Sequence, residues 1–232
     1  KLCALAKEPK NTVATFGDMI RVNGSKQSLE DAVADGAEVQ MVYSPFEILE
    51  LAKANPQKNY IFAAVGFETT TPIYAMIISE AIEQNINNIK LLTSLKIMPP
   101  ALRWICSQNP NIDGFIGPGH VSVITGSKIF DEISDDYNLP FAVAGFDAAQ
   151  ILAAIYTLIM KRGQSGVYNL YRNVVTREGN LKAQNIVSKY FETGDAAWRG
   201  IGQIENSGLY IKKEYASFDA GSNFLFNNVG AT

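Results

Sequence analysis

Six short apolar runs, rich in β-branched and aromatic residues, recur along the chain at a nearly regular interval. They end at positions 16, 43, 66, 94, 116 and 145, so that successive ends lie 22 to 29 residues apart. This interval accommodates one strand, one helix and two short loops. Most of the runs lack polar alternation, as is typical of strands buried on both faces of a parallel sheet. The pattern therefore predicts an α/β fold with right-handed βαβ crossovers.

Local signals place helices in the intervals between these strands. Residues 44–47 (SPFE) have the sequence of a capping box with a proline at the first helical position. A second helix is expected to begin at Thr71, and a third to follow Asp147 as its cap. Farther on, residues 179–193 favour a helix and residues 198–211 favour short strands and turns.

The composition is that of a globular protein and disfavours some classes of partner. Of the 232 residues, 47% are hydrophobic and 19% are charged, and the formal net charge is -3. No basic tract is present, so we expect neither nucleic acid nor a membrane surface as a partner. The longest apolar helical stretch, near residues 151–160, is shorter than the about 20 residues that span a bilayer. The protein is expected in the cytoplasm.

Conspicuous polar residues follow the carboxyl ends of the predicted strands. In open α/β sheets, ligands bind in the crevice at this edge, where helix N-termini offer free N–H groups to an anion. The side chains placed there by the sequence are those of Asp18, Arg21, Glu68, the threonines at 69–71, Lys96, His120 and Asp147. His120 is the only histidine of the chain.

Most of these residues also allow a purely structural interpretation. The threonines at 69–71 can cap a helix, the glycines around His120 can form a turn, and Asp18 can pair with Arg21 at the surface. Glu68, directly after a buried strand, is harder to explain in this way. Neither a GxGxxG nor a GxxxxGK[ST] phosphate motif occurs, nor a GxSxG nucleophile motif. From the residues alone, a small-molecule enzyme with an anionic substrate and a protein-binding module both remain open.

Six blocks of sequence narrow this choice. In chain order they are TFGDMIRVNGS, VYSPFEILELA, VGFETTTP, PGHVSVITG, GFDAAQIL and WRGIGQIENSGL. Together they extend over nearly the whole chain, and strings as long and unusual as TFGDMIR and GFETTTP seldom coincide by chance. In these blocks the chain resembles the HypD family, the hydrogenase formation proteins.

This resemblance implies a scaffold for [NiFe]-hydrogenase maturation, a protein that assembles a metal centre rather than a turnover enzyme. Family members bind a HypC-type chaperone and then a HypE-type cyanide donor. Together these proteins assemble an iron centre with cyanide and carbon monoxide ligands, the Fe(CN)2CO intermediate. The family fold is two Rossmann-like α/β units plus a lobe that holds a [4Fe-4S] cluster. We accordingly expect residues 1–55 to complete the first unit, residues 56–165 to form the second and residues 166–232 to be a partial C-terminal lobe.

The cysteine motifs of the family do not occur in this sequence. The family handles iron through a CGGHTH-type and a CPVC-type motif, and it holds its cluster with further cysteines near the C-terminus. Here Cys3 and Cys106 are the only cysteines, and they lack metal-site spacing. The chain begins without Met, inside the helix-like run KLCALAKE, so we expect it to be a central portion of a longer protein that by itself binds no metal.

Position by position, the resemblance implies a set of cleft-lining residues: Thr15, Asp18, Arg21, Glu68, Thr69, Thr70, His120 and Ser122. Arg21 would hold an anionic or cyanide-bearing ligand by charge-assisted hydrogen bonds. The hydroxyls and His120 would donate to cyanide nitrogens, while Glu68 would orient His120 or relay a proton. Three places depart from the usual family pattern, with Asn23 for Pro, Leu95 for His, and residues 147–150 (DAAQ) for Glu-Pro-Leu-Asp.

Overall fold

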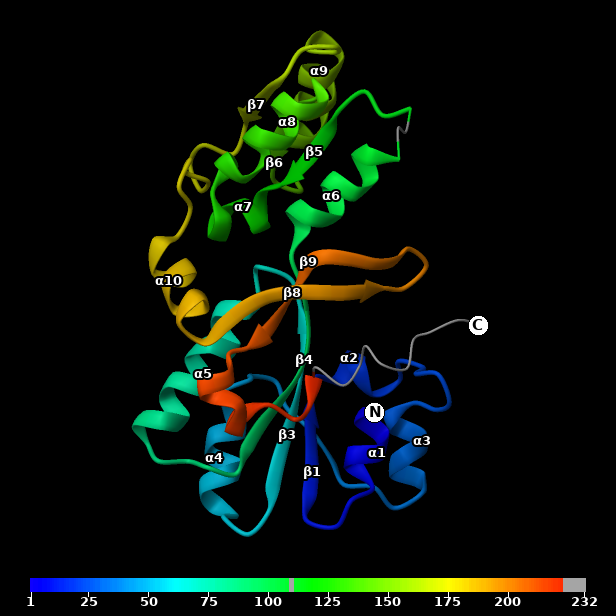
Figure 1. Ribbon diagram of the computed structural model, residues 1–232, viewed down its shortest axis with the longest axis vertical. Helices are drawn as coiled ribbons and strands as arrows, with labels where there is room; N and C mark the ends of the chain where they lie inside the picture. Colours follow the sequence, from blue (N-terminus) through cyan, green and yellow to red (C-terminus); the bar gives the residue numbers. More distant parts are fainter. Residues whose placement is uncertain (109–110, 223–232) are drawn as a thin grey trace.

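The computed structural model describes residues 1–108 and 111–222, which form two β-sheets flanked by helices (Figure 1). The larger sheet has the strand order β2-β1-β3-β4-β9-β8. Its first four strands are parallel, whereas β9 runs antiparallel to β4 and to β8. The strands are β1 (Asn11–Thr15), β2 (Val39–Met41), β3 (Asn59–Gly66), β4 (Ile89–Lys96), β8 (Phe191–Trp198) and β9 (Gly202–Ile211).

The smaller sheet contains three parallel strands in the order β5-β6-β7. They are β5 (Phe115–Pro118), β6 (Pro140–Ala144) and β7 (Gly166–Asn169). The prediction of an α/β fold is thereby confirmed, although the larger sheet is mixed rather than purely parallel.

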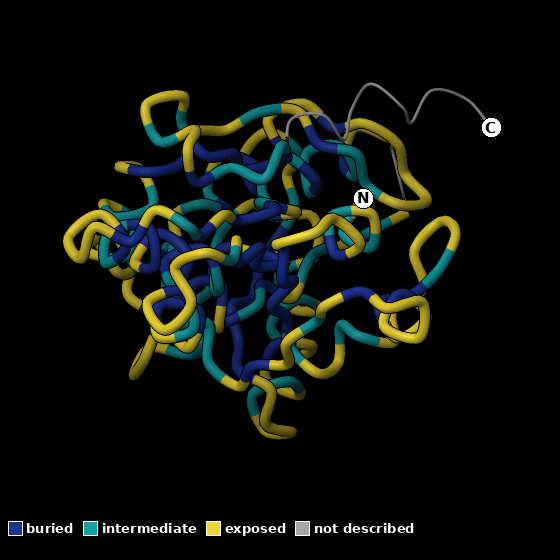
Figure 2. Tube along the Cα trace, turned by 90° about the horizontal axis from the view of Figure 1, so that it is seen from below, coloured by how far each residue is buried: buried dark blue, intermediate teal, exposed yellow. Residues whose placement is uncertain are grey.

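Helices cover both sheets, and the buried hydrophobic residues form clusters between them. In Figure 2 the buried segments lie toward the middle of the molecule and most of the outer loops are exposed. Those beside the larger sheet are α1 (Leu2–Ala6), α2 (Gly17–Ile20), α3 (Leu29–Ala34), α4 (Glu47–Ala54), α5 (Thr71–Glu83), α10 (Leu181–Tyr190) and the 3-10 helix η2 (Lys213–Phe218). Those beside the smaller sheet are α6 (Met98–Ser107), α7 (Gly119–Thr125), η1 (Ser127–Phe130), α8 (Asp131–Tyr137) and α9 (Ala148–Met160). No helix within 1–108 or 111–222 is both long and apolar enough to cross a membrane.

Most of the expected helix boundaries are confirmed. Helix α5 begins at Thr71, and the Asp147 carboxylate caps α9 by accepting the Gln150 N–H at 3.0 Å. Helix α4 differs, because it begins at Glu47, so that Pro45 lies before the helix. The Glu47 carboxylate nevertheless accepts the backbone N–H of Ser44 at 2.7 Å, which is one half of the expected capping box.

The expected division of the chain into three parts does not coincide with the two sheets. Strand β3 pairs directly with β1, so the division at residues 55 and 56 falls inside the larger sheet. The segment 166–232 is divided as well, since β7 completes the smaller sheet while β8 and β9 extend the larger one. Strand periodicity does not encode which distant strand becomes a partner, and this is the physical reason for the difference.

Candidate functional site

The candidate residues lie at the carboxyl edges of both sheets. Seven lie at the last residue of a strand of the larger sheet or after it: Thr15, Asp18, Arg21, Glu68, Thr69, Thr70 and Lys96. Three follow strands of the smaller sheet: His120, Ser122 and Asp147. Figure 1 shows that α2, which follows β1, and α7, which follows β5, both lie toward the middle of the molecule. The fold thus turns the two polar edges toward the region where the β8–β9 hairpin lies.

Glu68 is the most buried acid at the edge of the larger sheet. It is 8% exposed, and its Oε1 accepts the Met98 N–H at 2.6 Å. Pro99 and Pro100 follow in α6 and have no N–H, so Met98 supplies the only N–H of the first three helical residues. The other oxygen, Oε2, is buried without a hydrogen-bond partner among the described residues, and burial raises the pKa of the Glu68 carboxyl.

This contact adds a structural role to the expected one of Glu68. The carboxylate connects the β3–α5 loop to the segment that crosses from β4 of the larger sheet to α6 beside the smaller one. Within the described residues Glu68 makes no hydrogen bond to His120, and the prediction that Glu68 orients His120 or relays a proton stays a prediction. The sequence does not reveal the contact with Met98, because the two partners lie 30 positions apart in different elements.

The other charged groups at this edge are more accessible. Arg21 Nε lies 3.4 Å from Glu30 Oε1, and both side chains are exposed, so the surface pair expected between Arg21 and Asp18 is replaced by another. Lys96, at the end of β4, is half-buried and makes no ion pair within the described part of the chain, and burial lowers the pKa of its ammonium group.

Most of the hydroxyl groups bond to the chain itself or are buried, but Thr70, the N-cap residue of α5, makes no side-chain capping hydrogen bond. Thr70 Oγ1 and Thr71 Oγ1 both donate to the Phe67 carbonyl oxygen, at 3.1 and 3.0 Å. Ser122 Oγ is buried and donates to the Pro118 carbonyl oxygen, one turn earlier. Thr15 is fully buried, and its Oγ1 has no hydrogen-bond partner in the part of the chain described. The hydroxyls of Thr70, Ser122 and Thr15 are therefore engaged or buried rather than presented to a ligand.

His120 is exposed and lies in the first turn of α7. Its ring stacks on that of Phe146 with a centroid distance of 4.9 Å and an interplanar angle of 27°. A Cβ atom on Gly119 would lie 2.6 Å from the Ala144 carbonyl oxygen, so this glycine allows α7 to begin close to the end of β6. His120 and the loop that contains Asp147 are therefore brought together, as their shared edge predicts.

Exposed aromatic residues at these edges are a feature that the sequence interpretation missed. Phe146 is 75% exposed, and Phe67 is 41% exposed with its ring centroid 6.0 Å from that of Trp198. The signal was present in the sequence, because Phe67 and Phe146 each stand between a glycine and an acid directly after an apolar strand.

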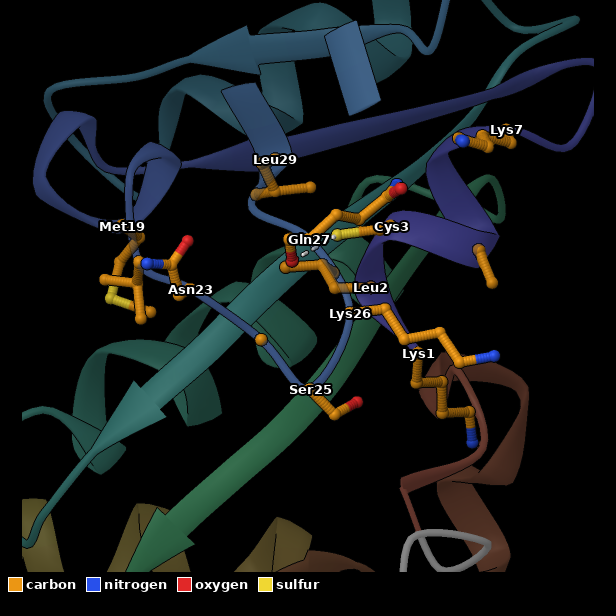
Figure 3. A pocket seen from close by; sticks show the side chains of 13 residues that line it. Lys1, Leu2, Cys3, Lys7, Met19, Asn23, Ser25, Lys26, Gln27 and Leu29 are labelled. Carbon is orange, nitrogen blue, oxygen red and sulfur yellow. Dashed lines mark hydrogen bonds between the residues drawn. The ribbon is translucent and has the colours of Figure 1, made fainter. Parts of the chain in front are cut away.

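A hollow of about 520 Å³ lies elsewhere, between α1 and the loop that leads to α3 (Figure 3). Cys3, Asn23 and Gln27 are among its lining residues, and Cys3 Sγ lies 3.7 Å from the Gln27 carbonyl oxygen. None of the candidate residues at the two edges lines it. Of the departures from the family pattern, Asn23 faces this hollow, whereas Leu95 is buried in the core of the larger sheet.

The residues of this chain do not fit a [4Fe-4S] cluster. Such a cluster takes four thiolates, whereas the sequence has Cys3 on α1 and Cys106 on α6. Within residues 1–108 and 111–222, no group of three or more His, Cys, Asp or Glu side chains has an arrangement that could hold a metal ion.

The chain is similar in sequence to a protein family and to several named proteins. The family model described as HypD, "Hydrogenase formation hypA family", matches residues 1–231. Proteins named hydrogenase maturation factor HypD are 38% identical in Escherichia coli (strain K12) over 224 residues, in Rhodobacter capsulatus over 224 residues and in Cupriavidus necator over 232 residues. Each alignment covers 95% of this chain, and 60%, 59% and 61% of the respective relative.

The fold defines an α/β protein with two sheets and polar residues at the carboxyl ends of its parallel strands, the edge at which open α/β sheets commonly bind ligands. Within that class, the chain belongs to the HypD family of hydrogenase formation proteins. It spans about 60% of the length of the curated relatives named above.

Proposed function

We propose that this chain is the two-sheet body of a scaffold for [NiFe]-hydrogenase maturation. With a HypC-type chaperone and a HypE-type cyanide donor, it assembles an iron centre that carries cyanide and carbon monoxide ligands. The observation that carries the proposal is the position of the family blocks, since TFGDMIR, VGFETTTP, PGHVS and GFD each coincide with the carboxyl end of a strand. The protein acts in the cytoplasm, and a [4Fe-4S] cluster in the complete protein would be held by residues other than these.

The accessible groups at the two edges suit an anionic, cyanide-bearing iron substrate. Arg21 and Lys96 supply positive charge at the larger sheet, and His120 supplies an exposed imidazole at the smaller one. A guanidinium or imidazole N–H that donates to a cyanide nitrogen is a charge-assisted hydrogen bond, which is stronger than a neutral one. In this proposal the chain binds and orients the substrate iron, and the bond-forming chemistry belongs to its partners.

Infrared spectroscopy of the assembled complex tests the proposal. The complete gene product is co-produced with its HypC-type and HypE-type partners and purified, and its spectrum is recorded in the region of metal-bound cyanide and carbon monoxide stretching bands. We expect both sets of bands at matched protein and iron content. Stoichiometric complex without either set would contradict the scaffold function and favour an enzyme for another anionic substrate.

A matched pair of arginine variants localises the substrate. Arg21→Ala removes an exposed guanidinium at the edge of the larger sheet, and Arg162→Ala removes another exposed one, paired with Asp113, beyond the end of α9. We expect weaker cyanide bands in the first variant alone, because only Arg21 lies at a carboxyl edge. Equal bands in both variants would remove Arg21 from the site.

A further inference from the structure

The two sheets carry the same three-residue plan at their carboxyl edges. Gly66–Glu68 begins at the last residue of β3, Gly145–Asp147 begins directly after β6, and each reads glycine, phenylalanine, acid. In both, the acid accepts an N–H from the first turn of a helix, at 2.6 Å from Met98 and at 3.0 Å from Gln150. In both, the phenylalanine is exposed and its ring meets an aromatic ring from another element.

In the Gly145–Asp147 turn, a second hydrogen bond besides that of Asp147 stabilises the backbone. The Gln150 side chain accepts the Gly145 N–H at 2.6 Å, while the Gln150 N–H donates to Asp147. These two hydrogen bonds to Gln150 therefore fix the backbone on both sides of Phe146. The exposed position of the Phe146 ring is consequently set by the fold of the loop and the start of α9.

The partner of Phe146 is the single histidine. No hydrogen bond to a ring nitrogen of His120 occurs within the described residues. A functional histidine is usually oriented by a hydrogen bond to one ring nitrogen, which leaves the other for chemistry. For His120, the face-to-face contact with Phe146 at 4.9 Å is the contact that orients the ring.

We propose that Phe146 is a positioning residue for His120 in the maturation reaction. Stacking fixes the plane of the imidazole while both ring nitrogens stay open to the substrate. This inference rests on the proposed function, because it gives His120 a task there. The Phe67–Trp198 pair at the other edge is built on the same plan without a histidine, and it provides a matched control.

Proton NMR of this chain tests the contact directly, because its one histidine gives an isolated pair of ring signals. Protons over an aromatic face are shielded, so the His120 signals are expected upfield of those of a free imidazole. Phe146→Leu keeps an apolar side chain but removes the ring, and should move the signals downfield. Phe146→Tyr should restore them, and Phe67→Leu should leave them unchanged. Unchanged signals in Phe146→Leu would overturn the proposal.

The functional arm uses the complete gene product and hydrogenase activity in a strain that lacks its own HypD-family gene. We expect Phe146→Leu to lower the yield of active hydrogenase about tenfold, because a misaligned group loses most of its catalytic value, and Phe146→Tyr to recover it. The thermal midpoint should change little, since the ring is exposed. Full activity in Phe146→Leu, or activity lost equally in Phe146→Tyr, would overturn the positioning role.

The two arms separate this inference from the proposed function. If the NMR signals move as expected but His120→Ala retains full hydrogenase activity, the stacking is real and the positioning role is excluded. If the wild-type gene product itself fails to support maturation, the proposed function fails, while the NMR result still reports on the contact.

Discussion

At the scale of single residues, burial divides the candidates into two kinds. Glu68 is buried against the N-terminus of α6, whereas His120 is exposed against Phe146. A buried carboxyl influences folding through its hydrogen bond and its ionisation, and an exposed imidazole has little influence on either. The two residues therefore predict opposite combinations of stability and function.

For Glu68 the prediction concerns pH. Burial raises the pKa of its carboxyl above the ordinary value of 4.5, so the native state binds this proton more tightly than the unfolded state. The stabilisation that this group contributes is present below pH 4.5 and is lost as pH rises through the raised pKa. We expect Glu68→Gln to flatten the fall in unfolding free energy above pH 4.5, as measured by urea titration between pH 4 and 8.

The control for this prediction is Glu47→Gln. Glu47 also accepts backbone N–H groups before a helix, but it does so at an exposed site. Its variant removes a carboxylate acceptor without removing a buried group, and a pH slope equal to that of Glu68→Gln would contradict the assignment of the effect to burial. Glu68→Ala, which leaves the Met98 N–H without its acceptor, should lose about 1–3 kcal/mol at any pH.

For His120 the prediction concerns function with little change in stability. His120→Ala removes an exposed ring, so the unfolding free energy should stay within about 0.5 kcal/mol of wild type. Hydrogenase maturation by the complete gene product should nevertheless decrease strongly. Wild-type maturation would exclude a role at the site, and a melt lowered by many degrees would instead assign His120 to the fold.

At the scale of elements, the sequence predicts what is local and misses what is distant. Strand β3 and helices α5 and α9 have their own signals, such as the apolar run, Thr71 and Asp147, and these are confirmed. The β8–β9 hairpin joins β4 through pairs such as Leu95 with Leu209, which no local pattern indicates. The same limit applies to the site, since the sequence places residues at an edge but does not give the partners of Glu68 or His120.

Substitutions at two glycines distinguish the stability cost of a strained backbone from the cost of a steric clash. Gly179 and Gly163 have φ values of 73° and 74°, in the left-handed region that disfavours a side chain. A Cβ on Gly179 would lie 2.2 Å from the Gly126 nitrogen, whereas one on Gly163 would meet no atom within 4 Å. We expect Gly163→Ala to lose about 1–2 kcal/mol and Gly179→Ala to lose clearly more, as measured by chemical denaturation. Equal losses of unfolding free energy in the two variants would show that the segment between α7 and α10 shifts and relieves the clash.

Substitutions at Leu95 test whether this position can accommodate the histidine that the resemblance to the HypD family implies. The side chain is 1% exposed in the core of the larger sheet, at a position where the resemblance to the HypD family implies His. Leu95→His would bury an imidazole among apolar side chains and should lower the unfolding free energy by about 1–3 kcal/mol. Leu95→Met, of similar volume, should lose less than about 1.5 kcal/mol. Equal stability of the His variant and wild type would show that a partner for the imidazole exists there.

At the scale of the whole molecule, the two carboxyl edges are the central feature. The chain leaves the larger sheet at Lys96 and enters α6 at Met98, and the Ile97 N–H between them donates to the Ser207 carbonyl oxygen of β9 at 2.9 Å. Together with the Glu68 contact, this bond holds the crossover on two sides. The relative position of the edges therefore depends on a short segment held by long-range contacts.

The most direct test of the whole account is complementation of a strain that lacks its HypD-family gene, with hydrogenase activity as the readout. We expect the complete gene product to restore activity, and a double variant with one substitution at each edge, Arg21→Ala with His120→Ala, to fail to restore it. The double variant should accumulate to the wild-type level, because both side chains are exposed. Absence of restored activity from wild-type protein that accumulates normally, or full activity from the double variant, would contradict this expectation.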